Sequence, residues 1–290
     1  MPAEEEKTEN TPFPENPWRV FFWEFILFFL TLTLGIISAW QITRIIGSQN
    51  LPPVPVSSNQ FIFSFFAATL IIFLIIRFLK FRTLKQTLFK IFFAVSIFLG
   101  SSLFFEIWLG TYISLALNLF LIILWLIKPN IMVHDFLFVS AMVGIGSVFG
   151  LRLFPLTVVI LLAVFSVYDV IAVYTTKHMV TMAKGMIEVG VVPGIILPSH
   201  TSGFQAPLKN VEFGGQFLVL GGGDIVFPLL LAASLIPQGI LNSVIIVVAS
   251  SIGLFLSFLI FISQKTRRAV PALPPIALLS IIGYLITRIL

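Results

Sequence analysis

Long apolar runs alternate with short polar breaks along almost the whole chain. A hydrocarbon core about 30 Å thick needs about 20 apolar residues in a helix that crosses it. We therefore expect an all-α fold, that of a polytopic membrane protein with about nine transmembrane helices. The runs place these helices at 19–46, 61–81, 88–109, 111–127, 134–150, 154–176, 216–236, 238–262 and 270–289.

Two stretches fall outside the apolar pattern. Residues 1–17 carry five glutamates and four prolines, so we expect a disordered cytoplasmic tail, and this acidic start is unlike a cleaved secretory signal. Residues 177–215 are predicted to be a cytoplasmic loop. The rest, 18–290, is expected to be a single transmembrane domain, with spans one to six at 19–176 and spans seven to nine at 216–289.

The positive charges predict how the helices are oriented. With the N-terminus in the cytoplasm, 14 of the 17 Lys and Arg residues lie on the cytoplasmic side, and only Arg44, Arg152 and Arg288 lie opposite. Cytoplasmic loops of membrane proteins carry such an excess. We expect a multi-pass protein of the cell membrane with an extracytoplasmic C-terminus. The net charge of +5 reflects this topology and does not indicate nucleic-acid binding.

Composition excludes several kinds of chemistry. Hydrophobic residues make up 58% of the chain and charged residues 10%, and the absence of cysteine excludes disulfides, thiol catalysis and thiolate metal sites. The histidines form no His-Glu-x-x-His pair, which argues against a zinc protease. His134 and Asp135 lie near a predicted helix end, where we expect surface side chains. Glu24 is near an edge, so we expect it either to snorkel or to pair.

Two acids, Asp169 and Asp224, lie deep inside predicted spans. Charge at this depth is costly unless it is buried or paired, so each is a candidate for function. Asp169 lies seven residues before the end of the sixth span, and Asp224 lies eight residues after the start of the seventh. At a rise of 1.5 Å per residue, both lie ~11–12 Å below the same membrane edge, so the carboxylates can face each other.

A pair of facing carboxylates suits acid–base hydrolysis of an amide. The two cannot both ionise easily, so we expect them to share a proton. In an aspartic protease one carboxylate takes a proton from the attacking water, and the other protonates the carbonyl oxygen. Two alternatives remain on this evidence: neutral acids that hold helices together, and ion ligands in an ion-coupled transporter or cation leak.

Two unusual segments accompany the acids. Gly221-Gly222-Gly223 removes side chains just before Asp224, which allows close helix packing or close approach of a substrate backbone. Pro271-Ala272-Leu273-Pro274, with a further proline behind it, interrupts regular helix near the same membrane edge. This second segment is either a cap for the last helix or a wall that faces substrate.

Three motifs resemble those of the presenilin and signal peptide peptidase family. Tyr168-Asp169, Gly221-Gly222-Gly223-Asp224 and Pro271-Ala272-Leu273-Pro274 look like its Tyr-Asp, Gly-x-Gly-Asp and Pro-Ala-Leu motifs, in the same order and on the same spans. The stretch 173–181 and the cytoplasmic N-terminus are most similar to archaeal presenilin homologues. The resemblance implies an intramembrane aspartic endopeptidase. Its catalytic pair would be Asp169 and Asp224, supported by Tyr168 and the three glycines, with 271–274 in substrate binding.

The resemblance also implies hydrolysis of single-span membrane proteins in the lipid bilayer without metal or organic cofactor, and it is compatible with a homo-oligomer. Gly222 departs from the family pattern, in which a larger apolar residue is more common, so we expect altered packing or substrate preference. The loop 177–215 is shorter than that of animal presenilins, which leaves self-cleavage open. A prepilin-type peptidase also carries Gly-x-Gly-Asp, but nine spans, Tyr168 and the proline segment disfavour it.

The loop contains a segment that predicts a short strand. Residues 189–198 combine β-branched side chains with proline and glycine, which disfavours a long helix. A helical substrate shields its own peptide bonds, so we expect it to unwind and to add a strand to this edge. Ile195, Ile196 and Leu197 would then belong to the binding surface. The alternative is a plain surface or reentrant loop.

Overall fold

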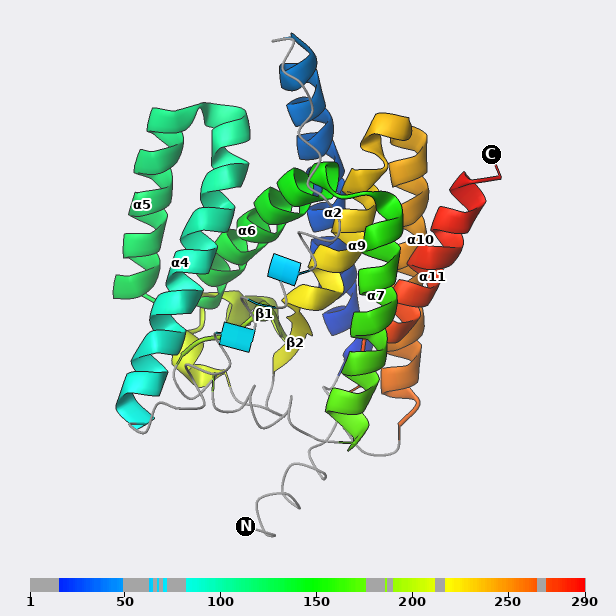
Figure 1. Cartoon of the computed structure of the whole chain (residues 1–290). Helices are drawn as coiled ribbons and strands as arrows, with labels where there is room; N and C mark the ends of the chain where they lie inside the picture. The colour runs from blue at the N-terminus through cyan, green and yellow to red at the C-terminus, as the bar shows by residue number, and fades with distance from the viewer. Residues whose placement is uncertain are drawn as a thin grey trace.

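A computed structural model of the chain describes residues 16–48, 63–64, 67, 70–71, 82–175, 186, 190–211, 217–264 and 270–289. Over these residues the protein is a bundle of helices with one two-stranded sheet set between them (Figure 1). Its elements are α2 (Pro17–Ser48), α4 (Arg82–Leu109), α5 (Thr111–Ile127), α6 (Ile131–Arg152), α7 (Pro155–Val170), η1 (Ile171–Thr175), β1 (Gly194–Pro198), η2 (Thr201–Gln205), η3 (Leu208–Asn210), β2 (Phe217–Gly221), α9 (Gly222–Ser234), η4 (Ile236–Gln238), α10 (Ile240–Ile262) and α11 (Leu273–Thr287).

The observed helices follow the apolar runs, which confirms the all-α membrane fold. Five helices are long and apolar enough to cross a membrane: α2, α4, α6, α10, and α7 together with η1. Three further apolar helices, α5, α9 and α11, are shorter. The part of the chain that the structure describes thus holds eight of the predicted spans. The predicted span 61–81 lies largely outside it, as do 1–15 and much of the loop 177–215.

The predicted seventh span, 216–236, is wrong at its start. Residues 217–221 form strand β2, and helix α9 begins only at Gly222. Hydropathy gives no distinction between a short apolar strand and the first turn of a helix, because both are continuous apolar runs. Asp224 therefore lies in the first turn of α9 and not two turns inside a longer helix.

The strand predicted within 189–198 is present as β1. It pairs antiparallel with β2 over five residues, from Gly194 opposite Gly221 to Pro198 opposite Phe217. A side chain at Gly194 would collide with the backbone carbonyl of Leu220, so the pairing of the two strands requires glycine there. β1 is buried along its whole length, whereas β2 is only partly covered.

The first turns of α2 lie at the same end of the molecule as the sheet. Arg19 donates from Nη2 to the hydroxyl of Thr201 at 3.5 Å, and the rings of Trp23 and Phe204 lie 5.7 Å apart. The far end of α11 lies at the opposite end of the bundle (Figure 1). The start of α2 and the end of α11 therefore lie on opposite faces of the bundle, as expected for an odd number of spans.

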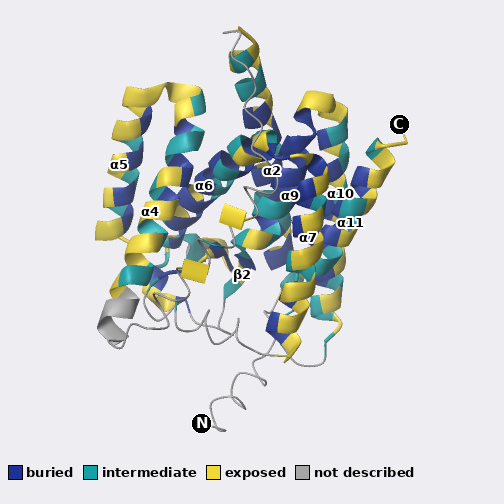
Figure 2. Ribbon diagram, in the orientation of Figure 1, coloured by how far each residue is buried: buried dark blue, intermediate teal, exposed yellow. Residues whose placement is uncertain are grey.

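Helix α9 is the centre of the bundle and contacts α2, α6, α7, α10 and α11. Figure 2 shows its buried residues enclosed by the surrounding helices. Leu229 has no exposed surface, and it fits between Gly35 of α2 and Gly146 of α6, where any side chain would meet it. Small residues at such contacts let helix backbones approach closely, which replaces the hydrophobic effect as the source of packing energy in lipid.

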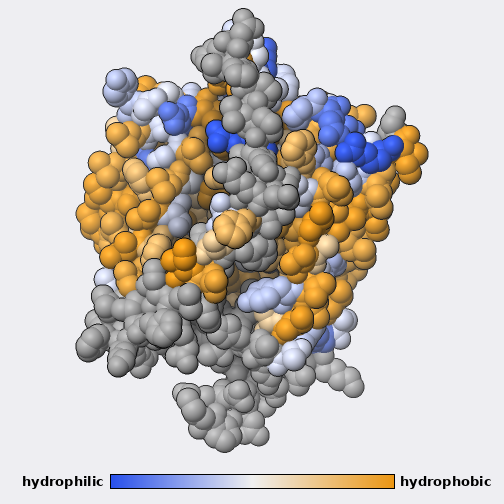
Figure 3. Space-filling view, in the orientation of Figure 1, coloured by the Kyte–Doolittle hydropathy of each residue, from blue (hydrophilic) through white to orange (hydrophobic). Residues whose placement is uncertain are grey.

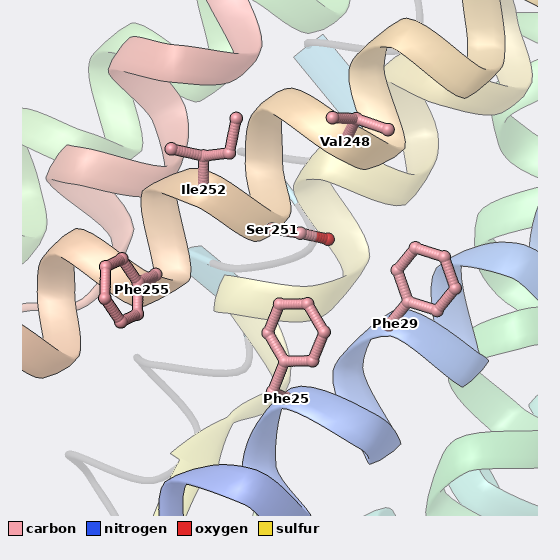
Figure 4. Close-up of a pocket in the computed structure, with 6 residues that line it drawn as sticks. All are labelled: Phe25, Phe29, Val248, Ser251, Ile252 and Phe255. Atoms are coloured by element: carbon pink, nitrogen blue, oxygen red, sulfur yellow. The ribbon is translucent and has the colours of Figure 1, made fainter.

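The outer surface suits lipid. Apolar side chains cover both flanks of the molecule in Figure 3, and polar residues gather toward its ends. A shallow furrow between α2 and α10 is lined by Phe25, Phe29, Val248, Ser251, Ile252 and Phe255 (Figure 4). Its single polar group, the Ser251 hydroxyl, donates to the backbone carbonyl of Val247 at 2.7 Å. The furrow therefore offers only apolar contact and carries no chemistry.

The contact between α4 and α6 should be sensitive to a single methyl group. A side chain at Gly144 would meet the backbone carbonyl of Gly100, which has no rotamer to move away. We expect Gly144→Ala to destabilise the protein by about 1–3 kcal/mol, the usual effect of overpacking. Gly47→Ala is the matched control, because nothing lies within 4 Å of that position. Thermal unfolding in detergent measures both, and equal melting temperatures would contradict the proposed contact.

Candidate active site

Asp169 lies at the C-terminal end of α7, where the helix changes its winding. It is the penultimate residue of α7, and the following turn, η1, is a π-helix. Such wide turns are rare and occur often at functional sites. The side chain is buried, with 9% of its surface exposed, although its neighbours Tyr168 and Val170 are exposed. The carboxylate therefore faces the interior of the bundle.

The proline segment supplies a hydrogen bond to this carboxylate. The backbone N–H of Leu273 donates to Oδ2 of Asp169 at 3.3 Å. Leu273 is the first residue of α11, and the N–H groups in the first turn of a helix have no partner within it. Pro274 and Pro275 have no N–H, so the prolines remove two such donors and leave that of Leu273 for Asp169. The segment thus has two roles: it begins α11, and it donates a hydrogen bond to the carboxylate of Asp169.

Asp224 occupies the third position of α9 after its N-cap, Gly221. Its carboxylate receives a backbone hydrogen bond from Gly221, which is one half of a capping box. The N-terminus of a helix also favours negative charge. A carboxylate at this position is thus fixed by its own helix, while its half-buried side chain keeps some access to solvent.

The two acids lie in one site. Asp169 and Asp224 interact electrostatically, and α9 packs against both α7 and α11. Helix α9 has 13 residues and α11 has 15, so at 1.5 Å per residue they span only about 20 and 22 Å of a core about 30 Å thick. Both helices begin beside the acids, and both bring a backbone N–H group to a carboxylate, Gly221 to Asp224 and Leu273 to Asp169.

Glu24 of α2 adds a third carboxylate, which the sequence analysis placed at an edge. Only 6% of its surface is exposed, and it interacts electrostatically with Asp224. The helical spacing of Glu24, Phe28 and Leu32 gives the signal that was overlooked: these residues share one face, and the two apolar ones are fully buried. An acid on the core face of a helix cannot snorkel to the surface.

The three glycines before Asp224 have different surroundings. A side chain at Gly221 would begin 3.0 Å from Oδ2 of Asp224, and Gly223 is exposed, with nothing closer than 3.7 Å. A side chain at Gly222 would begin 2.8 Å from the ring of Phe138 on α6. The space that a larger residue would fill at Gly222 is therefore filled by Phe138, which accounts for the departure from the family pattern.

The remaining predicted residues are placed as follows. Tyr168 is 58% exposed and lies on an outer side of α7, away from the buried face that carries Asp169. In the proline segment Pro271 is buried, whereas Ala272 and Pro274 are half-buried beside the site. Among the residues that the structure describes, no three His, Cys, Asp or Glu side chains gather as metal ligands.

Ile195, Ile196 and Leu197 are fully buried, which corrects the expectation that they form an open edge. The edge of β1 that faces away from β2 is occupied by α6, because the N–H of Ile196 donates to Oδ1 of Asp135 at 3.0 Å. Asp135 is 5% exposed, so the expectation that it lies at the surface is also wrong.

The open edge of the sheet belongs to β2. Because Ile196 turns its N–H away from β2, its partner Val219 also turns its backbone N–H and C=O outward. Within the described residues these groups have no hydrogen-bond partner, and the side chain of Val219 is 38% exposed. β2 runs directly into Gly221 and α9, so this edge leads to Asp224.

Comparison with known proteins identifies a matching family and similar solved structures. A model of the family described as signal-peptide peptidase, presenilin aspartyl protease matches residues 24–290. A solved structure of a presenilin family intramembrane aspartate protease in space group C222 is similar at a TM-score of 0.61 and 21% identity, covering 93% of this chain and 97% of that one. A structure in space group P2, with the same description, gives a TM-score of 0.57 and 25% identity, covering 90% and 96%.

A comparison with curated proteins gives no match.

The packing of Gly222 against Phe138 can be tested by exchanging the large and the small residue. We expect Gly222→Leu to lower both thermal stability and any activity of the site, because its side chain would overlap the Phe138 ring. Adding Phe138→Ala to the same chain should recover much of the loss, since it vacates that space. Melting temperatures of the two single variants and the double variant decide the matter; strictly additive losses would exclude the contact.

Proposed function

Because the chain belongs to the signal-peptide peptidase and presenilin family of aspartyl proteases, we propose that Asp169 and Asp224 are the catalytic pair of this intramembrane protease. The observation that carries the proposal is the hydrogen bond from Leu273 to Asp169. It joins two of the three sequence motifs in one site, and the electrostatic interaction between the acids joins the third.

The pair would hydrolyse a peptide bond by general acid–base catalysis. The ionised carboxylate takes a proton from water as the water oxygen attacks the carbonyl carbon. The protonated carboxylate gives its proton to the carbonyl oxygen. The resulting diol then collapses, the amide nitrogen takes up a proton, and the carbon–nitrogen bond breaks. No covalent intermediate with the enzyme forms, and no step needs a metal or an organic cofactor.

The backbone contacts of the two acids support this chemistry. Leu273 and Gly221 each hold one carboxylate through an N–H group, so neither acid needs a charged partner to keep its orientation. Half-buried Asp224 and exposed Gly223 give water a route to the pair from the side of the sheet. Without that route the acids would have no nucleophile to activate.

A transmembrane substrate must unwind before it is cut, and β2 offers the unwound segment a partner. The outward N–H and C=O of Val219 can pair with a substrate strand, which adds a third strand to the sheet. Such a strand would pass from β2 toward Asp224. Residues 195–197 then support the sheet from its buried side, and half-buried Ala272 and Pro274 line the opposite wall.

The proposed substrates are single-span membrane proteins, since one unwound helix can pair with the free edge that the described part of the sheet offers. We place the enzyme in the cell membrane with its N-terminus in the cytoplasm, following the distribution of Lys and Arg. The sheet, the first turn of α2 and the inner end of α7 would then lie on the cytoplasmic side. Soluble products would leave toward that side.

Loss of either acid should abolish proteolysis. We expect Asp169→Asn and Asp224→Asn each to reduce cleavage of a single-span test substrate by about a hundredfold to ten-thousandfold, since an amide neither accepts nor donates the required proton. Glu106→Gln, a change at an exposed acid of α4, should leave the rate unchanged. Mass spectrometry of the products in liposomes gives the rates. Cleavage that persists in both Asn variants would exclude the pair.

The free edge of β2 can be tested by removing one N–H group. Val219→Pro deletes the outward N–H and leaves the bonds between β1 and β2 in place. We expect kcat/KM to fall about threefold to tenfold, the loss of one net hydrogen bond, with little change in melting temperature. Val219→Ala keeps the N–H and should retain most of the activity. Equal rates for the two variants would show that substrate does not pair here.

A further inference from the structure

The outer edge of β1 offers no free backbone N–H group. Of the three residues that turn away from β2, Gly194 donates its N–H to the carbonyl of Val192 at 2.9 Å, and Ile196 donates to Asp135 at 3.0 Å. The third, Pro198, has no N–H. The carbonyl of Gly194 is also occupied, because Nε2 of His134 lies 3.2 Å from it. A carbonyl oxygen only accepts, so this nitrogen carries the proton.

His134 and Asp135 are fixed in place by α6 and its neighbours. The His134 ring is 1% exposed and packs against the rings of Phe93 and Phe138, with centroid distances of 5.8 and 5.9 Å. Asn130 caps the start of α6 by accepting the N–H of Val133 at 2.9 Å. The two side chains therefore form a rigid attachment point, and β1 is the segment attached to it.

One feature of this attachment lowers the stability of the folded protein. Oδ2 of Asp135 is buried and has no hydrogen-bond partner among the described residues, and burying such an oxygen is unfavourable. An acid is not required to accept this bond, since an amide or hydroxyl oxygen also accepts from a backbone N–H.

We propose that His134 and Asp135 are positioning residues that fix where β1 lies relative to the two acids. Because β1 pairs with β2, they also fix the position of β2, so that one substrate bond is presented to the acids. The proposal rests on the proposed function, because it assumes that substrate pairs with β2. The path is short: α6 holds β1, five residue pairs join β1 to β2, and β2 leads to Asp224.

The proposal predicts a loss of cutting precision when the attachment is cut. Without the attachment of β1 to α6, the sheet can shift relative to the acids. The substrate strand paired with β2 would shift with it, and a different peptide bond would reach the acids. An attachment that only stabilises the fold would affect the amount of active enzyme and leave the cut position unchanged. The distribution of cut positions therefore separates the two roles.

The test uses variants that keep the volume of each side chain. His134→Phe retains the stacked ring and removes the donor to Gly194, and Asp135→Leu removes the acceptor for Ile196 together with the unpaired oxygen. His134→Gln and Asp135→Asn keep the donor and the acceptor. All four full-length proteins are incubated in liposomes with one single-span substrate, and mass spectrometry gives the fraction cut at each bond.

We expect His134→Phe and Asp135→Leu to raise the fraction cut at neighbouring bonds about threefold to tenfold, which is the effect of losing one hydrogen bond. The Gln and Asn variants should give the wild-type pattern. If one apolar variant does not accumulate, the other tests the same claim through the second bond. A wild-type pattern in either folded apolar variant, at any rate of cleavage, overturns the proposal. A wild type that cuts nothing overturns the proposed function instead.

Discussion

The need to satisfy backbone polar groups inside a membrane governs this structure. Irregular backbone at membrane depth is stable only where protein or water covers it. Regular helix is interrupted near the acids in two segments. The first is the sheet, and the second is the start of α11. In the second, Pro274 and Pro275 remove two donors and Leu273 gives its N–H to Asp169. In the sheet, α6 closes the edge of β1, and the outward groups of Val219 remain for a substrate.

The same constraint explains how two acids are held in an apolar bundle. Helices α9 and α11 begin beside the two acids, where Gly221 donates to Asp224 and Leu273 to Asp169. Each directs N–H groups and the positive end of a helix dipole at one carboxylate. Asp224 is bound within its own helix and Asp169 by a neighbouring one. Within the described residues, the two acids therefore share a site in which backbone N–H groups hold the carboxylates.

Much of this arrangement is predictable from the sequence, and the exceptions share one cause. Apolar runs predict α5 to the residue, and an acid deep in a span draws attention to Asp169. Strand β2 was predicted as helix, because its apolar run takes its conformation from pairing with β1, a tertiary contact. His134, Asp135 and Glu24 were assigned to edges by distance along the chain, whereas their helical faces bury them. The position of a residue along a helix does not determine whether its side chain is buried, because that depends on which face of the helix it occupies.

The most direct test of the account is a structure of the Asp224→Asn variant with a single-span substrate bound. The account predicts a substrate segment in extended conformation, hydrogen-bonded to the backbone of Val219, with its next peptide bond beside Asp169. A substrate that passes the acids as an intact helix would contradict it. So would a substrate strand paired with the outer edge of β1, with His134 and Asp135 displaced.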